Sequence, residues 1–384
     1  MAHLDLVATS AFGTESIVAS ELKKLGVSET RIENGRVYFK GDYPLIVKTN
    51  LWLRCAERIM IIAGEFRAED FGELFDGTKN IRWEEMIPEN GIMHVTGKSV
   101  KSKLHSVPDC QAIVKKAVIE AMKRKFRREK FPEDGPLYKI EISMLKDIAT
   151  LSIDTSGAGL HRRGYRISQG EAPIKETLAA SIIYLSRWTS DRPFIDPMCG
   201  SGTFTIEAAC LARNIAPGLK REFSSESWPQ IPKKIWDTAR EEARSLIINP
   251  SLDISGFDID KKVFKAAEMN AAEAGVSDFI TFQKKPVSEL SSKKKYGCII
   301  CNPPYGERMD GGGSIFDLYR EMGEVFSRLD TWSIFILTAF ENFEKAYRKK
   351  ADRNRKLYNG KLKTYLYEYF GPRPERVRKN DTAL

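Results

Sequence analysis

The sequence predicts an α/β fold with a parallel sheet in the C-terminal part of the chain, preceded by a smaller α+β region. From about residue 165 onward, apolar strands alternate with helical segments, as in parallel sheets covered by helices on both faces. In this part, the stretch DPMCGSGT at residues 196–203 leads from a strand into a helix through two glycines. The length of 384 residues exceeds one typical domain, so we expect two or three.

The first region, residues 1–64, contains the elements of a small α+β domain. In chain order, hydrophobic periodicity predicts a strand, a helix, a hairpin and a helix–strand pair, at residues 4–11, 13–27, 31–41 and 42–66. The hairpin turn is expected at Asn34 and Gly35, because both residue types tolerate the left-handed backbone of a tight turn.

The second region, residues 65–163, is more basic. It predicts a strand, a basic loop, a long helix and two further strands. We expect the loop that carries Lys98, Lys101 and Lys103 to contact nucleic acid, because clustered lysines neutralise phosphates. The C-terminal end of the region is also basic, and it adds Arg162 and Arg163 to this predicted RNA surface. The basic end of the long helix, residues 123–128, fits a solvated helix end equally well.

The third region, residues 164–384, predicts the parallel sheet. Its strand–helix repeats end in a hairpin centred on Asn359 and Gly360, so the last strand should run antiparallel to the others. We also expect buried structural thiols at Cys298 and Cys301, because residues i and i+3 of a strand point to opposite faces. No second CxxC pair or neighbouring histidine completes a metal site, and no metal is predicted.

Bulk composition excludes some classes of protein and permits others. No apolar run reaches the roughly 18 residues of a membrane span, and the N-terminal stretch lacks a secretory pattern, so we expect a cytoplasmic protein. The 61 lysines and arginines against 52 acidic residues give a net charge of +9, which permits a polyanionic partner without requiring one.

Two predicted strand ends carry residues suited to a nucleoside cofactor. Gly200 and Gly202 allow the backbone to approach a ligand closely, but the third glycine of the dinucleotide fingerprint is absent, and no P-loop lysine follows. Asp258 closes its strand where a carboxylate can accept hydrogen bonds from a ribose diol. Asp260 is expected to cap the next helix.

A third strand end carries the sequence CNPPYGER. Pro303 and Pro304 cannot continue a central strand, so the strand must end there. The amide oxygen of Asn302 and a rigid backbone carbonyl are two acceptors, which suits an exocyclic nitrogen with two N–H protons. The ring of Tyr305 suits stacking on a planar base that has left its helix.

These motifs resemble a known family. DPMCGSGTFTIEAA together with CNPPYGER resembles the class I S-adenosylmethionine-dependent methyltransferases that act on exocyclic amines. LHRRGYR followed by EAPIKETLAA narrows the resemblance to RNA guanine-N2 methyltransferases with an N-terminal THUMP domain, which act on large-subunit ribosomal RNA. The resemblance implies a ferredoxin-like domain at residues 1–64, a THUMP RNA-binding domain at 65–163 and a Rossmann-like methyltransferase domain at 164–384.

The resemblance also implies roles for individual residues. The implied cofactor-binding residues are Ala172, Pro173, Lys175, Asp196, Met198, Gly200, Gly202, Thr203, Asp258, Ile259 and Val287. The implied catalytic residues, which hold the target base, are Asn302, Pro303, Pro304 and Tyr305. One position departs from the family pattern, because Pro286 stands where an acid usually binds the cofactor adenine. The backbone of Val287 or nearby Ser288 would have to substitute for it.

The expected reaction is direct transfer of the sulfonium methyl group to N2 of guanine, with Asn302 and the Pro303 carbonyl as acceptors of the amino protons. The residues alone leave guanine and adenine open, so an adenine-N6 methyltransferase acting on DNA or RNA is an alternative. A dinucleotide-binding oxidoreductase and a non-catalytic RNA-binding module are alternatives of other classes. We also expect that a free guanine nucleotide could occupy the base pocket, and that residues 309–314 form either a lid or a solvated loop.

Overall fold

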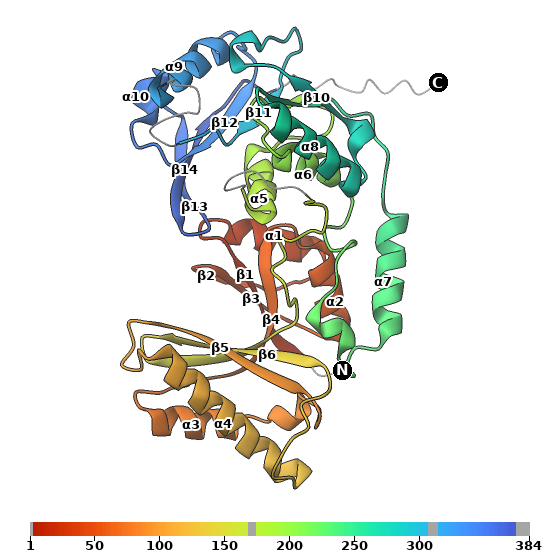
Figure 1. Ribbon diagram of the computed structural model, residues 1–384, viewed down its shortest axis with the longest axis vertical. Coiled ribbons are helices and arrows are strands. Elements are labelled where there is room, and N and C mark those ends of the chain that lie inside the picture. Colours follow the sequence, from red (N-terminus) through yellow and green to blue (C-terminus); the bar gives the residue numbers. More distant parts are fainter. Residues whose placement is uncertain (1–2, 168–173, 306–313, 374–384) are drawn as a thin grey trace. The chain divides into compact units, whose positions relative to one another are not determined.

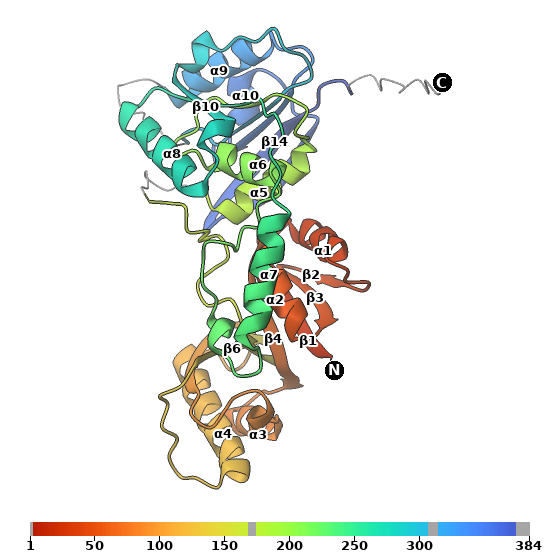
Figure 2. The same ribbon diagram turned by 90° about the vertical axis from the view of Figure 1, so that its right-hand side faces the viewer.

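Two seven-stranded sheets organise the chain (Figures 1 and 2). The computed structural model describes residues 3–167, 174–305 and 314–373. It divides into two compact units, the first formed by residues 1–163 and 216–246, the second by residues 164–215 and 247–384. The chain therefore passes between the units three times.

The first sheet has the strand order β2-β3-β1-β4-β7-β6-β5. Its strands are β1 (Leu4–Ser10), β2 (Arg31–Glu33), β3 (Arg36–Gly41), β4 (Ala56–Arg67), β5 (Ile92–Val100), β6 (Leu137–Leu145) and β7 (Ile148–Asp154). The helices of this region are α1 (Glu15–Lys24), α2 (Tyr43–Trp52), α3 (Phe71–Asn80) and α4 (Val107–Phe126), with a 3₁₀ turn at Trp83–Glu85.

Two features of this sheet bear on the expectations. The predicted hairpin is confirmed, because β2 and β3 pair antiparallel around Gly35, whose φ is +72°. The expected domain junction between residues 64 and 65 falls inside β4, which pairs with β1 and with β7. The ferredoxin-like and THUMP regions therefore share one continuous sheet.

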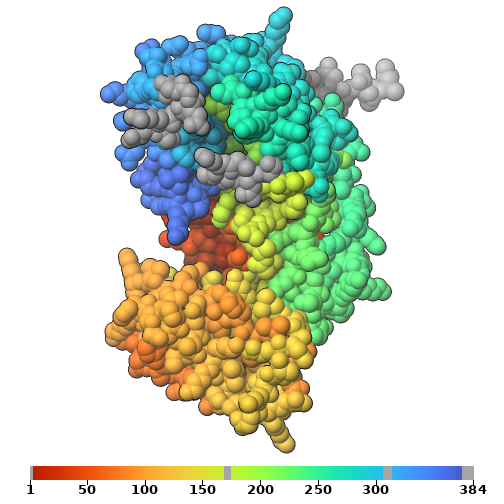
Figure 3. Space-filling view, in the orientation of Figure 1, coloured from red at the N-terminus to blue at the C-terminus, as the bar shows by residue number. Residues whose placement is uncertain are grey.

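Residues 216–246 fold with the first unit, although they interrupt the C-terminal domain in sequence. This segment contains a 3₁₀ turn (Ser224–Ser227) and α7 (Lys233–Ser245). Trp228 stacks on Tyr138 of β6 with ring centroids 4.5 Å apart, and the Arg221 guanidinium donates to the carbonyl of Gly159 at 2.7 Å. Figure 3 shows the segment in green against the yellow and orange surface of the same unit.

The second sheet has the order β10-β9-β8-β11-β12-β14-β13. Its strands are β8 (Phe194–Asp196), β9 (Ile254–Asp258), β10 (Ile280–Lys284), β11 (Cys298–Cys301), β12 (Ser333–Thr338), β13 (Arg353–Asn359) and β14 (Leu362–Tyr369). The strands from β10 to β12 run parallel, whereas β14 runs antiparallel to both of its neighbours. The predicted Rossmann-like fold with an antiparallel last strand is confirmed.

Helices cover both faces of this sheet. One core contains residues of α5 (Glu176–Ser186), α6 (Thr203–Ala212) and α8 (Lys261–Ala274), and the other contains residues of α9 (Ile315–Phe326) and α10 (Phe343–Tyr347). Two 3₁₀ turns, Ser277–Phe279 and Val287–Glu289, flank β10. Cys298 belongs to the first core and Cys301 to the second, as the period of a strand predicts. None of the described helices is long and apolar enough to cross a membrane.

Candidate active site

The carboxyl ends of three neighbouring strands define the candidate site. β8 lies between β9 and β11, so the strand order reverses beside it, and ligands of open α/β sheets bind at such a switch point. Asp196 ends β8, Asp258 ends β9, and Asn302 directly follows β11. The structure therefore brings together at one edge the three strand ends that the sequence singled out.

The glycine turn after β8 leaves room for a ligand. Gly200 and Gly202 both have left-handed backbones, with φ of +54° and +81°. A Cβ on Gly202 would lie 3.1 Å from the Cβ of Ala267, so only glycine allows α8 to pack this closely. A Cβ on Gly200 would meet nothing nearer than 4.0 Å. The backbone is therefore tightly supported on one side and open at Gly200.

Asp258 joins the glycine turn to the end of β9. One carboxylate oxygen accepts the N–H of Gly200 and the other accepts the N–H of Asp260, both at 3.0 Å. Each carboxylate oxygen has two lone pairs, so the group keeps acceptor capacity for a ribose diol. Asp260 caps α8 as predicted, because its carboxylate accepts the N–H of Lys262 at 2.7 Å.

Asp196 is the buried acid of the site. Its side chain is only 2% exposed, and it accepts the N–H of Met198 at 3.2 Å. Burial, with a smaller contribution from the neighbouring charge of Asp258, raises the pKa of Asp196 well above its usual value. A cationic group of a ligand placed beside it would relieve this cost, as the ammonium group of a bound amino acid moiety would.

Arg166 supports the glycine turn through hydrogen bonds. The sequence had given no role for this residue. Its guanidinium donates to Glu176 at 2.8 Å, to the hydroxyls of Ser201 and Thr203 at 3.3 and 3.0 Å, and to the carbonyl of Ile174 at 3.2 Å. The side chain is 11% exposed. Arg166 therefore fixes both the turn and the start of α5. Its place in the LHRRGYR motif was the available signal.

The other expected cofactor residues lie around this edge. Ile259, directly after β9, is 59% exposed, which leaves an apolar surface for an adenine ring. Met198 packs partly against the α9 core, whereas the side chain of Val287 is buried in it, so Val287 could offer only its backbone. Lys175 immediately precedes α5. Ala172 and Pro173 lie outside the described residues.

Asn302 presents a buried acceptor atom to the site. Its Oδ1 atom has no hydrogen-bond partner among the described residues. An unpaired buried carbonyl oxygen is costly, so such groups in folded proteins call for an explanation such as a ligand. Pro303 is buried and Tyr305 is half-buried beside it. The carbonyl of Pro304 points into the fold, because it accepts the hydroxyl of the buried Tyr319 at 3.0 Å.

Two further aromatic residues support this strand end. Tyr319 of α9 is fully buried, and its hydroxyl lies 2.7 Å from Oγ1 of Thr338 at the end of β12. Phe340 follows that strand, half-buried, with its ring 5.5 Å from the ring of Tyr319. Sequence reasoning missed both residues. Of the expected lid at residues 309–314, only Ser314 is described, and it caps α9.

The expected RNA surface of the first unit is largely paired. Lys98 lies on β5 rather than in a loop, which corrects the prediction, and it contacts Glu141 at 2.8 Å. Lys103 pairs with Glu69 and, together with Arg67, lowers the pKa of that carboxyl to about 2. Lys101 is exposed in the following turn.

The two arginines at the exit of this region differ. Arg162 is exposed. Arg163 is 5% exposed, and its guanidinium donates to the carbonyls of Leu160 and Arg54. The prediction that Arg163 contacts RNA is therefore wrong for this conformation, because the guanidinium is occupied inside the fold.

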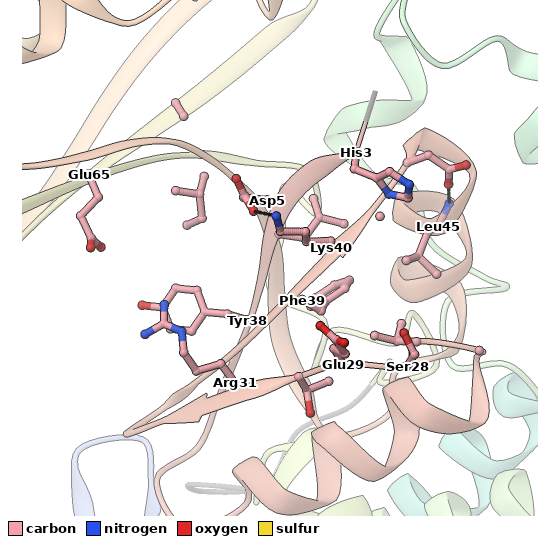
Figure 4. Close-up of a pocket in the computed structure, with 18 of the residues that line it drawn as sticks. His3, Asp5, Ser28, Glu29, Arg31, Tyr38, Phe39, Lys40, Leu45 and Glu65 are labelled. Carbon is pink, nitrogen blue, oxygen red and sulfur yellow. Dashed lines mark hydrogen bonds and ion pairs between the residues drawn. The ribbon is translucent and has the colours of Figure 1, made fainter. Parts of the chain in front are cut away.

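A separate pocket of about 1060 Å³ lies at the start of β1 in the first unit (Figure 4). Side chains of both charges line it, among them Asp5 and Lys40, which form an exposed ion pair at 3.9 Å. None of the predicted site residues lines this pocket. Within the described part of the chain, no three histidine, cysteine or acidic residues gather as a metal site would require.

Comparison with known proteins places the chain in a family. Residues 163–368 match the family described as the RMKL-like methyltransferase domain, residues 5–60 match the RlmL ferredoxin-like domain, and residues 68–154 match the THUMP domain. A protein of Bacillus subtilis (strain 168) named "Putative RNA methyltransferase YpsC" is 48% identical over 387 residues, which cover 100% of both chains.

Solved structures give the same result. A structure from Listeria monocytogenes str. 4b F2365, named a "predicted N6-adenine-specific DNA methylase", is 51% identical, covers 97% of both chains and has a TM-score of 0.91. A second, "SMU.472, a putative methyltransferase complexed with SAH", is 47% identical, covers 98% of this chain and 100% of its own, and has a TM-score of 0.92. The chain therefore belongs to the RMKL-like methyltransferases with ferredoxin-like and THUMP domains, and its cofactor is S-adenosylmethionine.

Proposed function

We propose that this enzyme methylates the exocyclic N2 amine of a guanosine in RNA, and specifically in large-subunit ribosomal RNA. The observation that carries the proposal is the buried Oδ1 of Asn302, which has no hydrogen-bond partner in the described part of the chain and lies at the carboxyl ends of the strands where the cofactor binds. An amine with two N–H protons is the complementary group for that acceptor. The THUMP match and the name of the Bacillus relative support RNA as the substrate.

S-adenosylmethionine supplies an electrophilic methyl group on a sulfonium. The guanine amine is a poor nucleophile, because its lone pair is delocalised into the ring. Asn302 and the carbonyl of Pro303 accept hydrogen bonds from its two N–H groups, which draws the nitrogen towards tetrahedral geometry and points its lone pair at the methyl carbon. The carbon–sulfur bond breaks as the carbon–nitrogen bond forms, and the nitrogen then releases one proton to water.

The remaining parts of the site have supporting roles in this proposal. Asp258 takes the ribose hydroxyls, Ile259 packs on the adenine, and the open backbone at Gly200 lies against the methionine end. Asp196 compensates the charge of the cofactor ammonium. Tyr305 stacks on the target base, and Phe340 offers a second ring near it.

We keep the three-domain division as part of the proposal, with the ferredoxin-like domain at residues 1–64, the THUMP domain at 65–163 and the methyltransferase domain at 164–384. In this division, residues 216–246 are an insertion of the methyltransferase domain that folds with the first unit. Arg162 and Lys101 remain candidates for the RNA surface of that unit.

A second candidate is methylation of adenine N6, because the same amide oxygen accepts an adenine amine equally well. The name of the Listeria structure, at 51% identity, is the observation that favours it. Guanine over adenine rests on the family resemblance of LHRRGYR and EAPIKETLAA.

The deciding experiment is methyl transfer from labelled S-adenosylmethionine to total RNA from cells that lack this protein, followed by nucleoside analysis. Labelled N2-methylguanosine in large-subunit RNA is the expected product. Labelled N6-methyladenosine would show that the target base is adenine and not guanine. DNA is tested in parallel, and labelling of DNA but not of RNA would contradict RNA as the substrate. Inhibition by free guanosine monophosphate, and not by adenosine monophosphate, would separately support a guanine pocket.

A further inference from the structure

The C-terminal hairpin carries an alternating pattern of lysines and tyrosines on one face. Lys356 and Tyr358 lie two residues apart on β13, and Lys363 and Tyr365 lie two residues apart on β14, so each pair shares a face. The strands pair Lys356 with Tyr365 and Tyr358 with Lys363. Each lysine therefore has a tyrosine beside it along its strand and another across the ladder.

Both lysines of the hairpin lie over aromatic rings. The ammonium of Lys356 lies 5.3 Å from the centre of the Tyr358 ring, and that of Lys363 lies 5.3 Å from the Tyr365 ring. Both lysines are exposed. Among the described residues, no carboxylate forms an ion pair with either of them. Their charge is therefore held over aromatic rings without being neutralised.

This face begins next to the candidate base site. Tyr365 is the register partner of Thr338, whose hydroxyl lies 2.7 Å from that of Tyr319. Tyr319 in turn donates to the carbonyl of Pro304 at 3.0 Å. Only β12 separates β14 from β11, which places β14 about 10 Å from the strand that Asn302 follows. That distance is within reach of one or two nucleotides. Figure 1 shows β13 and β14 in blue beside β12.

The place of the cofactor site and the charges of the hairpin together indicate the direction in which a polyanion would run. On the β8 and β9 side of Asn302, the proposed cofactor site occupies the strand ends. On the β12 and β14 side, the nearest exposed charges of the hairpin are cationic. A nucleic acid strand that delivers one base to Asn302 therefore finds the first side occupied by the cofactor, and the cations of the second side attract it.

We propose that the β13–β14 hairpin binds the single-stranded RNA segment next to the target nucleotide. Lys356 and Lys363 contact its phosphates, and the partly exposed ring of Tyr365 stacks on the neighbouring base. Lysines that neutralise phosphates, interleaved with aromatic rings that accept any base, are the components of single-strand binding surfaces. This inference rests on the proposed function, because it assigns the substrate path of the same site.

The test removes the two charges without touching the base site. The double variant Lys356→Gln/Lys363→Gln is compared with the control Lys293→Gln/Lys295→Gln. The control loses the same charge from exposed positions that precede β11, at the amino end of that strand. Affinity for a short single-stranded RNA is measured over a salt series. The hairpin variant is expected to bind roughly tenfold more weakly near 0.15 M salt, with the log–log salt slope reduced by about 1.4. The control is expected to match the parent protein, and equal affinity and slope for the two double variants would overturn the inference.

A second pair of variants tests the stacking. Tyr365→Phe keeps the ring and is expected to bind RNA within about twofold of the parent protein, whereas Tyr365→Leu is expected to lose about tenfold. Equal binding by both variants would overturn the role of the ring. RNA binding and methyl transfer are measured separately, so the two proposals fail separately. RNA binding that depends on the hairpin, without methyl transfer, contradicts only the proposed function. Methyl transfer with an unchanged KM for RNA in the lysine variant contradicts only this inference.

Discussion

The sequence predicted functional residues both at the strand ends of the second sheet and in the basic stretch of the first unit. The two regions differ in whether their polar groups are buried and whether they have partners. At the strand ends, Asn302 Oδ1 is buried without a partner among the described residues, and Asp196 is buried with a raised pKa. In the basic stretch, Lys98 and Lys103 are exposed and each pairs with a glutamate.

The two kinds of polar group differ in their free-energy cost to the folded protein. A buried acceptor without a partner costs free energy in the folded protein, and Asn302 holds one at the switch point of the sheet, where ligands bind, so the two observations together point to a ligand. An exposed ion pair costs little and contributes little, so it points to nothing beyond the surface. The unpaired groups are therefore the better guide to function, and each prediction below either tests or refines that distinction.

The largest effect is expected for Asn302→Ala. Turnover should fall by about 10²- to 10³-fold, because an acceptor that strengthens in the transition state is removed. Cofactor affinity should not change. Since the lost oxygen has no partner among the described residues, the free energy of unfolding should change by less than about 1 kcal/mol.

A matched control is Asn270→Ala in α8. Asn270 is also buried, but its amide donates to the carbonyl of Ser201 at 3.1 Å and accepts the N–H of Ile167 at 2.9 Å. That variant should lose about 1–3 kcal/mol of stability in urea unfolding, because it leaves both groups unpaired. Normal turnover in Asn302→Ala would rule out the proposed mechanism.

Arg166→Lys should destabilise the protein by about 2–4 kcal/mol, because lysine cannot reproduce the fork of hydrogen bonds that holds Glu176 and Thr203. The cofactor should bind more weakly in proportion to the disorder of the glycine turn. The measurements are denaturant unfolding and cofactor titration. If the variant is as stable as the parent and binds cofactor normally, Arg166 does not position the turn.

Asp196→Asn should stabilise the cofactor-free protein and weaken cofactor binding. Burial raises the pKa of Asp196 above its unfolded value of about 4, so its contribution to stability is most favourable at low pH and is lost as pH rises. The variant should therefore be more stable by about 1–3 kcal/mol at pH 7, and the gain should vanish near pH 4. Thermal unfolding at a series of pH values measures this, and a gain that is constant with pH would contradict the assignment.

The smallest effect is expected in the basic stretch. Replacing Lys98, Lys101 and Lys103 together by glutamine should weaken RNA binding by less than about threefold, with a change in salt slope of about 0.7 from Lys101 alone. Glu141→Gln offers a converse test, because it frees Lys98 and should strengthen binding slightly. A loss as large as that of the hairpin variant would show that the ion pairs open when RNA binds.

Much of the fold was predictable because its signals are local. The turn at Asn34 and Gly35, the cap at Asp260 and the end of β11 shortly before Pro303 each depend on residues close in sequence. The same holds for the three strand ends of the site, since each is marked by a glycine turn, an acid or a proline pair. That they meet at one edge follows from the parallel sheet.

Partner choice between distant residues was not predictable in the same way. Whether Lys103 is free or paired depends on Glu69, 34 positions away, and the partners of Arg163 include a carbonyl 109 positions away. The fold of residues 216–246 onto the first unit depends on contacts such as Trp228 with Tyr138, which no local pattern encodes. The alternation of lysines and tyrosines on the β13–β14 hairpin is visible in the sequence. The position of this hairpin beside Thr338 and Pro304 is not.

The amino-acid sequence by itself therefore determined the order of the elements, the Rossmann-like class and the motifs at the strand ends, because period, turn chemistry and spacing act over a few residues. Only the tertiary structure decided which polar groups remain without a partner. A hydrogen bond or an ion pair is satisfied by whichever group the folded chain brings within about 3 Å, whatever its distance along the sequence.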